Sequence, residues 1–262
     1  MKSLSILITG GSRGIGRALA LHLAALGHRI AITGRDPGAL AAAHSELPAG
    51  SLMLPGDTTD EHACADAVMQ VIDTWGKVDV LINNAGIYGD GAGFLSTAGN
   101  NWWRVIETNL KGPMLFMAQT LPHMLQQDSG IIINIGSYAA IRPLPGNSAY
   151  SASKASLARL TDSVAEEVKD SRVQLFCVSP GLVETDMTRG KPAFEQVPVD
   201  AWSQPADICG TVQRLLGGDC QLLNGRFLHV HDDVDELLAS AQTIIDEGLY
   251  QLRLDGLDGL IR

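Results

Sequence analysis

Short apolar runs rich in β-branched residues alternate along this chain with longer segments of helical period. Seven runs have the length and composition of strands: Leu4–Thr9, Arg29–Thr33, Ser51–Leu54, Val78–Asn83, Gly130–Ile135, Val173–Val178 and Arg226–Val230. Six segments carry apolar residues at spacings of three and four: Ile15–Leu26, Pro37–His44, Glu61–Trp75, Trp102–Met124, Ala149–Lys169 and Ala206–Leu216. Because parallel strands are joined by helical crossovers, the alternation predicts an α/β fold with one doubly wound, mainly parallel seven-stranded sheet and helices on both faces.

Composition and charge narrow the class of protein. The 262 residues are 45% hydrophobic and 18% charged, a balance that supports a sizeable core, and no linker or repeat divides them. We therefore expect residues 1–262 to form a single domain. The net charge of −10 and the lack of a basic run argue against nucleic acid as a partner. No run approaches ~20 apolar residues, and the four cysteines have no CxxC spacing, so we expect a cytoplasmic protein with neither a membrane segment nor a disulfide framework.

Two segments depart from the alternation. Residues 184–204 show no clear period and contain Gly190, Pro192 and Pro198, which is typical of a substrate lid. Residues 232–262 form a C-terminal extension, with a predicted helix at Val234–Glu247 and a leucine-rich run at Tyr250–Ile261. The extension packs on its own domain or pairs with another subunit, and the sequence leaves both alternatives open.

A glycine-rich turn follows the first predicted strand. Its sequence is Gly10-Gly11-Ser12-Arg13-Gly14-Ile15-Gly16, and a predicted helix follows at once. Glycines let the backbone turn tightly and approach a pyrophosphate, while the helix N-terminus supplies unpaired N–H groups and a partial positive charge. The position of the turn, between a strand and a helix, favours a phosphate-binding site over a plain connecting loop.

This turn resembles that of the classical short-chain dehydrogenase/reductase family, and later motifs support the resemblance. Asn83-Asn84-Ala85-Gly86 follows the fourth strand and Ser137 follows the fifth. Tyr150-Ser-Ala-Ser-Lys154 comes 13 residues after Ser137, and Pro180-Gly181 closes the sixth strand. The resemblance covers residues 3 to 231. It implies a Rossmann-like fold, an NAD(P)(H) cofactor, an oxidoreductase acting on CH–OH groups, and a homo-oligomer, either a tetramer or a dimer.

The spacing of Tyr150 and Lys154 has a physical rationale. Side chains four residues apart emerge on one face of a helix. The pKa of free tyrosine is about 10, and lowering it by about 3 units takes about 4 kcal/mol. An ammonium at about 4 Å in an effective dielectric of about 20 supplies about that much. The pair therefore predicts a phenol that exchanges a proton near neutral pH.

By resemblance, four residues form the catalytic set: Asn109, Ser137, Tyr150 and Lys154. Tyr150 would act as the general acid or base on the substrate oxygen, and Ser137 would bind that oxygen. Lys154 would lower the Tyr150 pKa and hold the nicotinamide ribose. Asn109 would anchor a water molecule that links Lys154 to solvent, or serve as an ordinary polar residue of its helix. Hydride passes directly between nicotinamide and substrate in this family, so no metal is expected.

The residues after the second strand favour NADP(H), although NAD(H) remains an alternative. Gly34 stands where NAD-preferring family members carry a carboxylate for the adenosine ribose. Arg13 and Arg35 offer guanidinium groups to a 2′-phosphate, and each charge-assisted bond contributes about 1.5–3 kcal/mol. Asp36 competes, because a carboxylate turned inward would repel that phosphate. Asp57 and Thr58 resemble the family's adenine-contacting pair, and Asp57 could equally cap a helix.

The full set of cofactor-binding residues that the resemblance implies is Gly10, Ser12, Arg13, Gly14, Ile15, Gly16, Arg35, Asp57, Thr58, Asn83, Ala85, Gly86, Tyr150, Lys154, Pro180, Gly181, Val183 and Thr185. The expected substrate residues are Tyr88, Tyr138, Leu144, Met187, Phe194 and Trp202. They are mainly apolar, without a convergent Arg/Lys pair, so we expect a ketone or secondary alcohol of low charge.

The sequence thus predicts an NADP(H)-dependent short-chain oxidoreductase. A 3-oxoacyl-(acyl-carrier-protein or CoA) reductase is the alternative within enzymes, although the acidic chain offers few lysines for docking an acidic carrier. A non-catalytic NADP(H)-binding regulatory protein is the alternative of another class. His229 and His231 lie near several aspartates, and a strand end followed by a helix N-terminus explains that cluster better than a metal site does.

Overall fold

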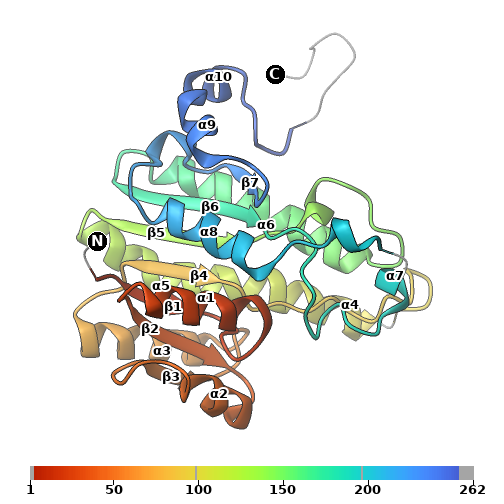
Figure 1. Cartoon of the computed structure of the whole chain (residues 1–262), viewed down its shortest axis with the longest axis horizontal. Helices are drawn as coiled ribbons and strands as arrows, with labels where there is room; N and C mark the ends of the chain where they lie inside the picture. The colour runs from red at the N-terminus through yellow and green to blue at the C-terminus, as the bar shows by residue number, and fades with distance from the viewer. Residues whose placement is uncertain (1–2, 98, 196, 254–262) are drawn as a thin grey trace.

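The protein, described here by a computed structural model for residues 3–97, 99–195 and 197–253, is built around one seven-stranded parallel sheet (Figure 1). The strands are Ser5–Ile8 (β1), Arg29–Gly34 (β2), Leu52–Pro55 (β3), Val80–Asn83 (β4), Gly130–Ile135 (β5), Val173–Ser179 (β6) and Phe227–His229 (β7). Their order is β3-β2-β1-β4-β5-β6-β7, so the winding reverses between β1 and β4. A crevice at the carboxyl ends of these two strands is where such sheets bind ligands.

Helices cover both faces of the sheet, as the alternation predicts. Figure 1 shows α1 and α8 in front of the strands and α3, α5 and α6 behind them. The helices are Gly14–Ala25 (α1), Pro37–His44 (α2), Glu61–Trp75 (α3), Gly99–Ile106 (α4), Gly112–Gln126 (α5), Ser148–Glu167 (α6), Pro192–Glu195 (α7), Pro205–Leu215 (α8), Val234–Ala239 (α9) and Ala241–Asp246 (α10). Successive strand side chains enter opposite cores: Ile6 and Ile8 pack on the α1/α8 side and Leu7 on the α3/α5 side. The continuous apolar runs therefore reflect burial on both faces.

The long helix predicted at Trp102–Met124 is interrupted. It begins at Gly99, continues as a π-helical turn over Glu107–Lys111, and resumes as α5. A π turn inserts one residue into the helical repeat and rotates the side chains beyond it, and such turns are frequent at functional sites. Apolar spacing alone does not reveal it.

The C-terminal extension packs on its own domain as far as the structure describes it. The predicted helix Val234–Glu247 is divided into α9 and α10 at Ser240, and Val234 and Ile244 join the core beside α8. The backbone N–H of Phe227 donates a hydrogen bond of 2.8 Å to the carbonyl of Tyr250, so the extension satisfies part of the free edge of β7. Residues 254–262 of the predicted extension lie outside the described residues.

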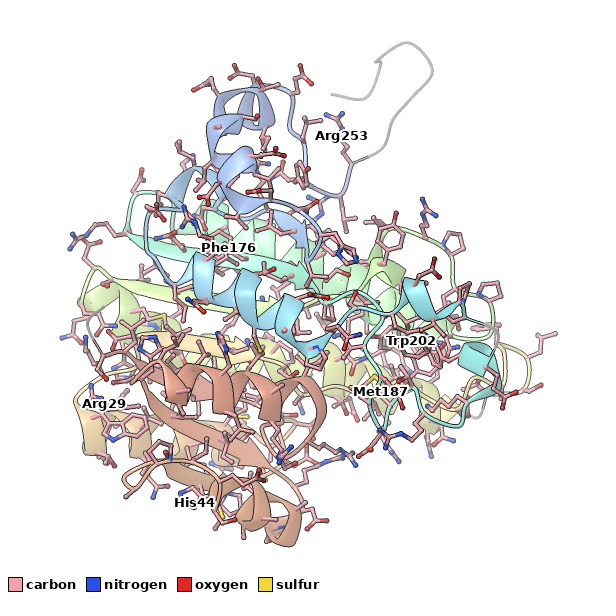
Figure 2. The ribbon with its side chains drawn as sticks, viewed as in Figure 1. Arg29, His44, Phe176, Met187, Trp202 and Arg253 are labelled. Atoms are coloured by element: carbon pink, nitrogen blue, oxygen red, sulfur yellow. The ribbon has the colours of Figure 1, made fainter. Side chains whose placement is uncertain are left out.

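The predicted lid lies beyond the carboxyl ends of the strands. It contains α7 and a 3₁₀ turn at Val199–Ala201, and a β-bridge between Val183 and Ser203 joins its two ends. Figure 2 shows Met187 and Trp202 on this side of the molecule, at the opposite end from Arg29, where β2 begins. In the described part of the chain, no helix is both long enough and apolar enough to cross a membrane.

Candidate active site

A cleft of about 920 Å³ extends along the carboxyl ends of the strands, from the glycine turn to the lid. It brings together side chains that lie far apart in the sequence. The predicted residues that line it are Gly10, Ser12, Arg13, Gly14, Ile15, Arg35, Thr58, Ala85, Gly86, Tyr88, Tyr150, Lys154, Pro180, Thr185 and Met187. The strand order, with its reversal between β1 and β4, places this cleft at the expected crevice.

Hydrogen bonds hold the glycine turn against the end of β4. The Asn84 side chain donates to the carbonyls of Thr9 and Gly10, at 2.9 and 3.1 Å, and the Thr9 hydroxyl accepts from the N–H groups of Asn84 and Ala85. Gly10 has a φ of +66°, and a Cβ on Gly16 would lie 2.3 Å from the Gly10 carbonyl oxygen. Only glycine fits either position, so the close turn that the sequence predicts is present.

The turn fits a dinucleotide pyrophosphate. Arg13 precedes α1 with extended backbone and makes no side-chain cap, so within the described chain the first N–H groups of α1 stay available to an anion. Gly16, Asp57, Asn83, Gly181 and Val183 do not line the cleft. Gly16 and Asn83 support it from behind: Gly16 permits the turn, and the buried Asn83 amide donates to Asn134 on β5 at 2.9 Å.

At the adenosine end, two arginines form exposed ion pairs. An Arg13 nitrogen lies 3.8 Å from Asp186 and an Arg35 nitrogen lies 3.6 Å from Asp57. Exposed pairs of this kind contribute about 0–1 kcal/mol, so both guanidiniums can turn to a phosphate at little cost. Asp36 caps α2 by accepting from the N–H groups of Gly38 and Ala39, which engages the carboxylate that would otherwise oppose that phosphate.

The alternative role of Asp57 as a helix cap is not what the structure shows. Asp60 caps α3, accepting from the N–H groups of His62 and Ala63. Asp57 instead accepts from the backbone and hydroxyl of Thr59, both at 2.9 Å. Burial raises the Asp57 pKa, but the Thr59 hydrogen bonds and the positive charge of Arg35 lower it by more. The Asp57 pKa therefore lies below its usual value.

At the other end of the cleft, Tyr150 and Lys154 meet, and Ser137 lies beside Tyr150 without lining the cleft. Lys154 is 5% exposed, and its ammonium donates a 2.7 Å hydrogen bond to the Ile135 carbonyl at the end of β5. Its Nζ lies 5.8 Å from the Tyr150 ring centroid, and the Ser137 side chain is close enough to the Tyr150 phenol to lower its pKa. The helical spacing therefore brings Tyr150 and Lys154 to the same end of the cleft.

The predicted direction of the Tyr150 pKa differs from the one in this structure. Burial raises the pKa of the Tyr150 phenol, and the nearby Ser137 side chain only partly offsets this rise. Burial also lowers the pKa of Lys154 to about 8. The reason is physical: both groups are removed from water, which disfavours the phenolate and the ammonium alike. Sequence spacing shows proximity and does not show this desolvation.

Asn109 lies within the π-helical turn and is fully buried. Its side-chain oxygen accepts from the Ile87 N–H at 2.8 Å, and its amide donates to the Ile87 carbonyl and to the Ser153 hydroxyl at 2.9 and 3.0 Å. Asn109 thus ties the segment after Asn83–Gly86 to α6, one residue before Lys154. Asn109 does not itself line the cleft, and the water molecule that the resemblance implies stays a prediction.

Of the six expected substrate residues, only Tyr88 and Met187 line the cleft. The Tyr88 ring lies 5.1 Å from that of Tyr150, and its hydroxyl accepts a 3.0 Å hydrogen bond from Asn147. Phe194 packs on the outer side of Tyr88 and against Trp202, at 5.3 and 6.3 Å between ring centroids. These two aromatic residues support the wall instead of forming it.

Tyr138 and Leu144 also lie outside the cleft lining. The exposed Tyr138 ring contacts Arg142 and His229 instead. His229 packs on His231 at 4.9 Å between ring centroids, and no group of three metal-ligating side chains occurs among the residues the structure describes.

Sequence reasoning missed two cations of the cleft, Arg104 from α4 and Lys191 from the lid. The expected substrate residues included no Arg or Lys, so both cations are additions to that set. No sequence motif marks either position: Arg104 lies in an amphipathic helix and Lys191 in a segment without period. The other lining residues outside the predicted set are Gly34, Asp36, Ala39, Gly56, Asn84, Ile87, Gly89, Asp90, Asn101, Val105, Thr108, Ile135, Gly136 and Asp186.

Comparisons with known proteins agree with this geometry. The family model described as short chain dehydrogenase matches residues 5–196. The 3-oxoacyl-(acyl-carrier-protein) reductase FabG of Staphylococcus epidermidis is 33% identical over 237 residues, which cover 87% of this chain and 97% of that protein. The short chain dehydrogenase pigC of Monascus ruber is 31% identical over 251 residues, covering 92% and 83%. The crystal structure of levodione reductase superposes with a TM-score of 0.81 at 26% identity, covering 91% of this chain and all of that one. The chain belongs to the short-chain dehydrogenase family and is an oxidoreductase of secondary alcohols and ketones.

Proposed function

We propose that this protein transfers hydride between NADP(H) and a ketone or secondary alcohol, with Tyr150 as the general acid or base. One observation carries the proposal: a single cleft joins a pyrophosphate-binding turn to Tyr150 and Lys154, and Ser137 lies beside the Tyr150 phenol. Bound nicotinamide would supply the hydride for reduction, or accept it for oxidation. Pro180 and Thr185, which line the cleft, would seat its carboxamide.

The protein groups handle the proton and the developing charge. Ser137 would donate a hydrogen bond to the substrate oxygen, and Tyr150 would deliver a proton to it during reduction. Lys154, fixed by the Ile135 carbonyl, would hold the nicotinamide ribose beside the Tyr150 ring. In the oxidised complex the positive charge of the nicotinamide would favour the phenolate and so offset the burial that raises the Tyr150 pKa.

A carbonyl panel tests the reaction class. Purified protein is incubated with linear, cyclic and aryl ketones and either NADPH or NADH, and cofactor oxidation is followed by absorbance. We expect turnover with NADPH on part of the panel. A lack of turnover with both cofactors on every ketone would contradict the proposal.

Preference for NADP(H) rests on Arg13 and Arg35. We expect Arg35→Ala, and separately Arg13→Ala, to raise the KM for NADPH about 10- to 100-fold, the equivalent of one charge-assisted phosphate contact. The KM for NADH should change little, because NADH has no 2′-phosphate. Steady-state kinetics with both cofactors check this, and an equal loss with NADH would contradict the assignment.

A 3-oxoacyl-(acyl-carrier-protein) reductase is a second candidate, favoured by the names of relatives such as the S. epidermidis protein. Docking an acidic carrier needs free basic side chains near the cleft. Here Arg189 is paired with Glu184 and Asp186, and Arg142 lies over the Tyr138 ring. Charge reversal of Arg142 and Arg189 tests this candidate: unchanged kcat/KM on a carrier-linked substrate would count against it.

A further inference from the structure

Lys191 brings a cation from the lid to the substrate end of the cleft. Its Nζ lies 4.7 Å from the centroid of the Tyr88 ring and 3.4 Å from the carbonyl oxygen of Gly89. Tyr88 in turn packs against Tyr150, with 5.1 Å between the ring centroids and an angle of 52° between the ring planes. The ammonium is therefore within about 10 Å of the centroid of the Tyr150 ring.

This cation is poorly compensated for a group that is partly withdrawn from water. An ammonium has three donors, and the contacts the structure describes for Lys191 are one long hydrogen bond and one ring face. No carboxylate of the described chain lies within ion-pair distance of it, although the more distant Asp90 contributes attraction. Burial lowers the Lys191 pKa despite Asp90. A charge in such surroundings gains most from an anionic partner with good hydrogen-bond geometry.

The neighbouring lid cation shows the contrast. Arg189 is exposed, forms ion pairs with Glu184 and Asp186, and does not line the cleft. Lys191, two residues further on, lines the cleft and faces the wall that Tyr88 forms. The lid therefore has one arginine already neutralised at the surface and one lysine that lines the same cleft as Tyr150.

We propose that Lys191 binds a carboxylate of the substrate, which makes the preferred substrate an oxo acid or hydroxy acid whose carboxylate lies a few carbon atoms from the reacting carbon. This inference rests on the proposed hydride-transfer function and replaces the low-charge substrate expected from sequence. The carboxylate would contact the ammonium beside Tyr88 while the carbonyl oxygen contacts Tyr150 and Ser137. The long contact to Gly89 would give way to a charge-assisted one.

Matched pairs of acid and ester test the proposal. The probes are 4-oxopentanoate and 5-oxohexanoate, each compared with its methyl ester, and the proteins are wild type, Lys191→Met and Lys191→Arg. In the wild type we expect kcat/KM for at least one acid to exceed that for its ester about 10- to 100-fold. Lys191→Met should remove this preference by raising the KM of the acid while leaving the ester unchanged. Lys191→Arg should retain much of it, and Arg189→Met, the matched control, should retain all of it.

A binding measurement tests the proposal even if neither oxo acid is reduced. Calorimetric titration of the enzyme–NADPH complex with pentanoate should show binding that Lys191→Met abolishes and that methyl pentanoate does not reproduce. Equal losses on acid and ester, or no binding of pentanoate, would overturn the proposal and leave Lys191 as a lid contact. These outcomes are distinct from failure of the proposed function, because reduction of the methyl esters would still demonstrate hydride transfer.

Discussion

Tyr150→Phe is expected to lower kcat by about 10²- to 10⁴-fold, the range that a positioned general acid contributes. The ring remains and keeps its contact with Tyr88, so the cleft retains its shape. Only the phenol hydroxyl beside Ser137 is lost. NADPH binding, followed by fluorescence titration, should stay unchanged, because the glycine turn and the two arginines are untouched.

Tyr138→Phe is the matched control. It also removes a phenol hydroxyl, one residue after Ser137, but the Tyr138 ring is exposed and lies outside the cleft lining. We expect it to retain wild-type kcat. Full activity in Tyr150→Phe would contradict the role of the phenol. Absence of activity in the wild type, with intact NADPH binding, would instead favour the regulatory, non-catalytic alternative.

Lys154→Met is expected to impair catalysis and to stabilise the fold. Methionine has a similar length but cannot hold the nicotinamide ribose, so we expect a loss of about 10²-fold or more in kcat/KM, comparable to the loss of a positioned acid–base group. The same change removes a charge that is 5% exposed and satisfied by one described hydrogen bond, to the Ile135 carbonyl. Such a trade between stability and activity is typical of active-site charges.

The pH dependence of this stabilisation follows from the lowered pKa of Lys154. Burial lowers the Lys154 pKa from 10.5 to about 8. Between these two pH values the unfolded chain binds more protons than the folded protein, so the free energy of unfolding of the wild type increases as the pH rises. Below pH 8 the buried ammonium costs up to about 3 kcal/mol, which Lys154→Met would recover. Denaturant unfolding at pH 7 and pH 10 checks this: the variant should be more stable at pH 7, and the gap should narrow at pH 10. A variant that is less stable at both values would contradict the expectation.

The fold followed from the sequence because burial on both faces leaves a simple pattern. Runs such as Ile131-Ile132-Ile133 are apolar at every position only when both sides of the strand are covered. The π turn around Asn109 did not follow, because it changes the helical repeat without changing which residues are apolar. The spacing of apolar residues also gives no sign of the break at Ser240 between α9 and α10.

At the candidate site, sequence spacing predicted where Tyr150 and Lys154 lie but not how deeply they are buried. The i, i+4 relation of Tyr150 and Lys154 placed both at the cleft, but burial depends on distant strands and reverses the expected shift of the Tyr150 pKa. Lys191 lies in an irregular lid, where its neighbour Tyr88 is about a hundred residues away in sequence, so only the tertiary structure identifies it. The same holds for Phe194, which supports Tyr88 from behind.

Isotope transfer tests the central claim most directly. NADPH carrying deuterium at both C4 positions of the nicotinamide is incubated with the wild-type protein and a ketone that it reduces, and the alcohol is analysed by mass spectrometry and proton NMR. We expect one deuterium in each product molecule, bonded to the carbinol carbon. An alcohol without deuterium at that carbon would show that hydride does not pass directly from the nicotinamide to the substrate, and would contradict the account.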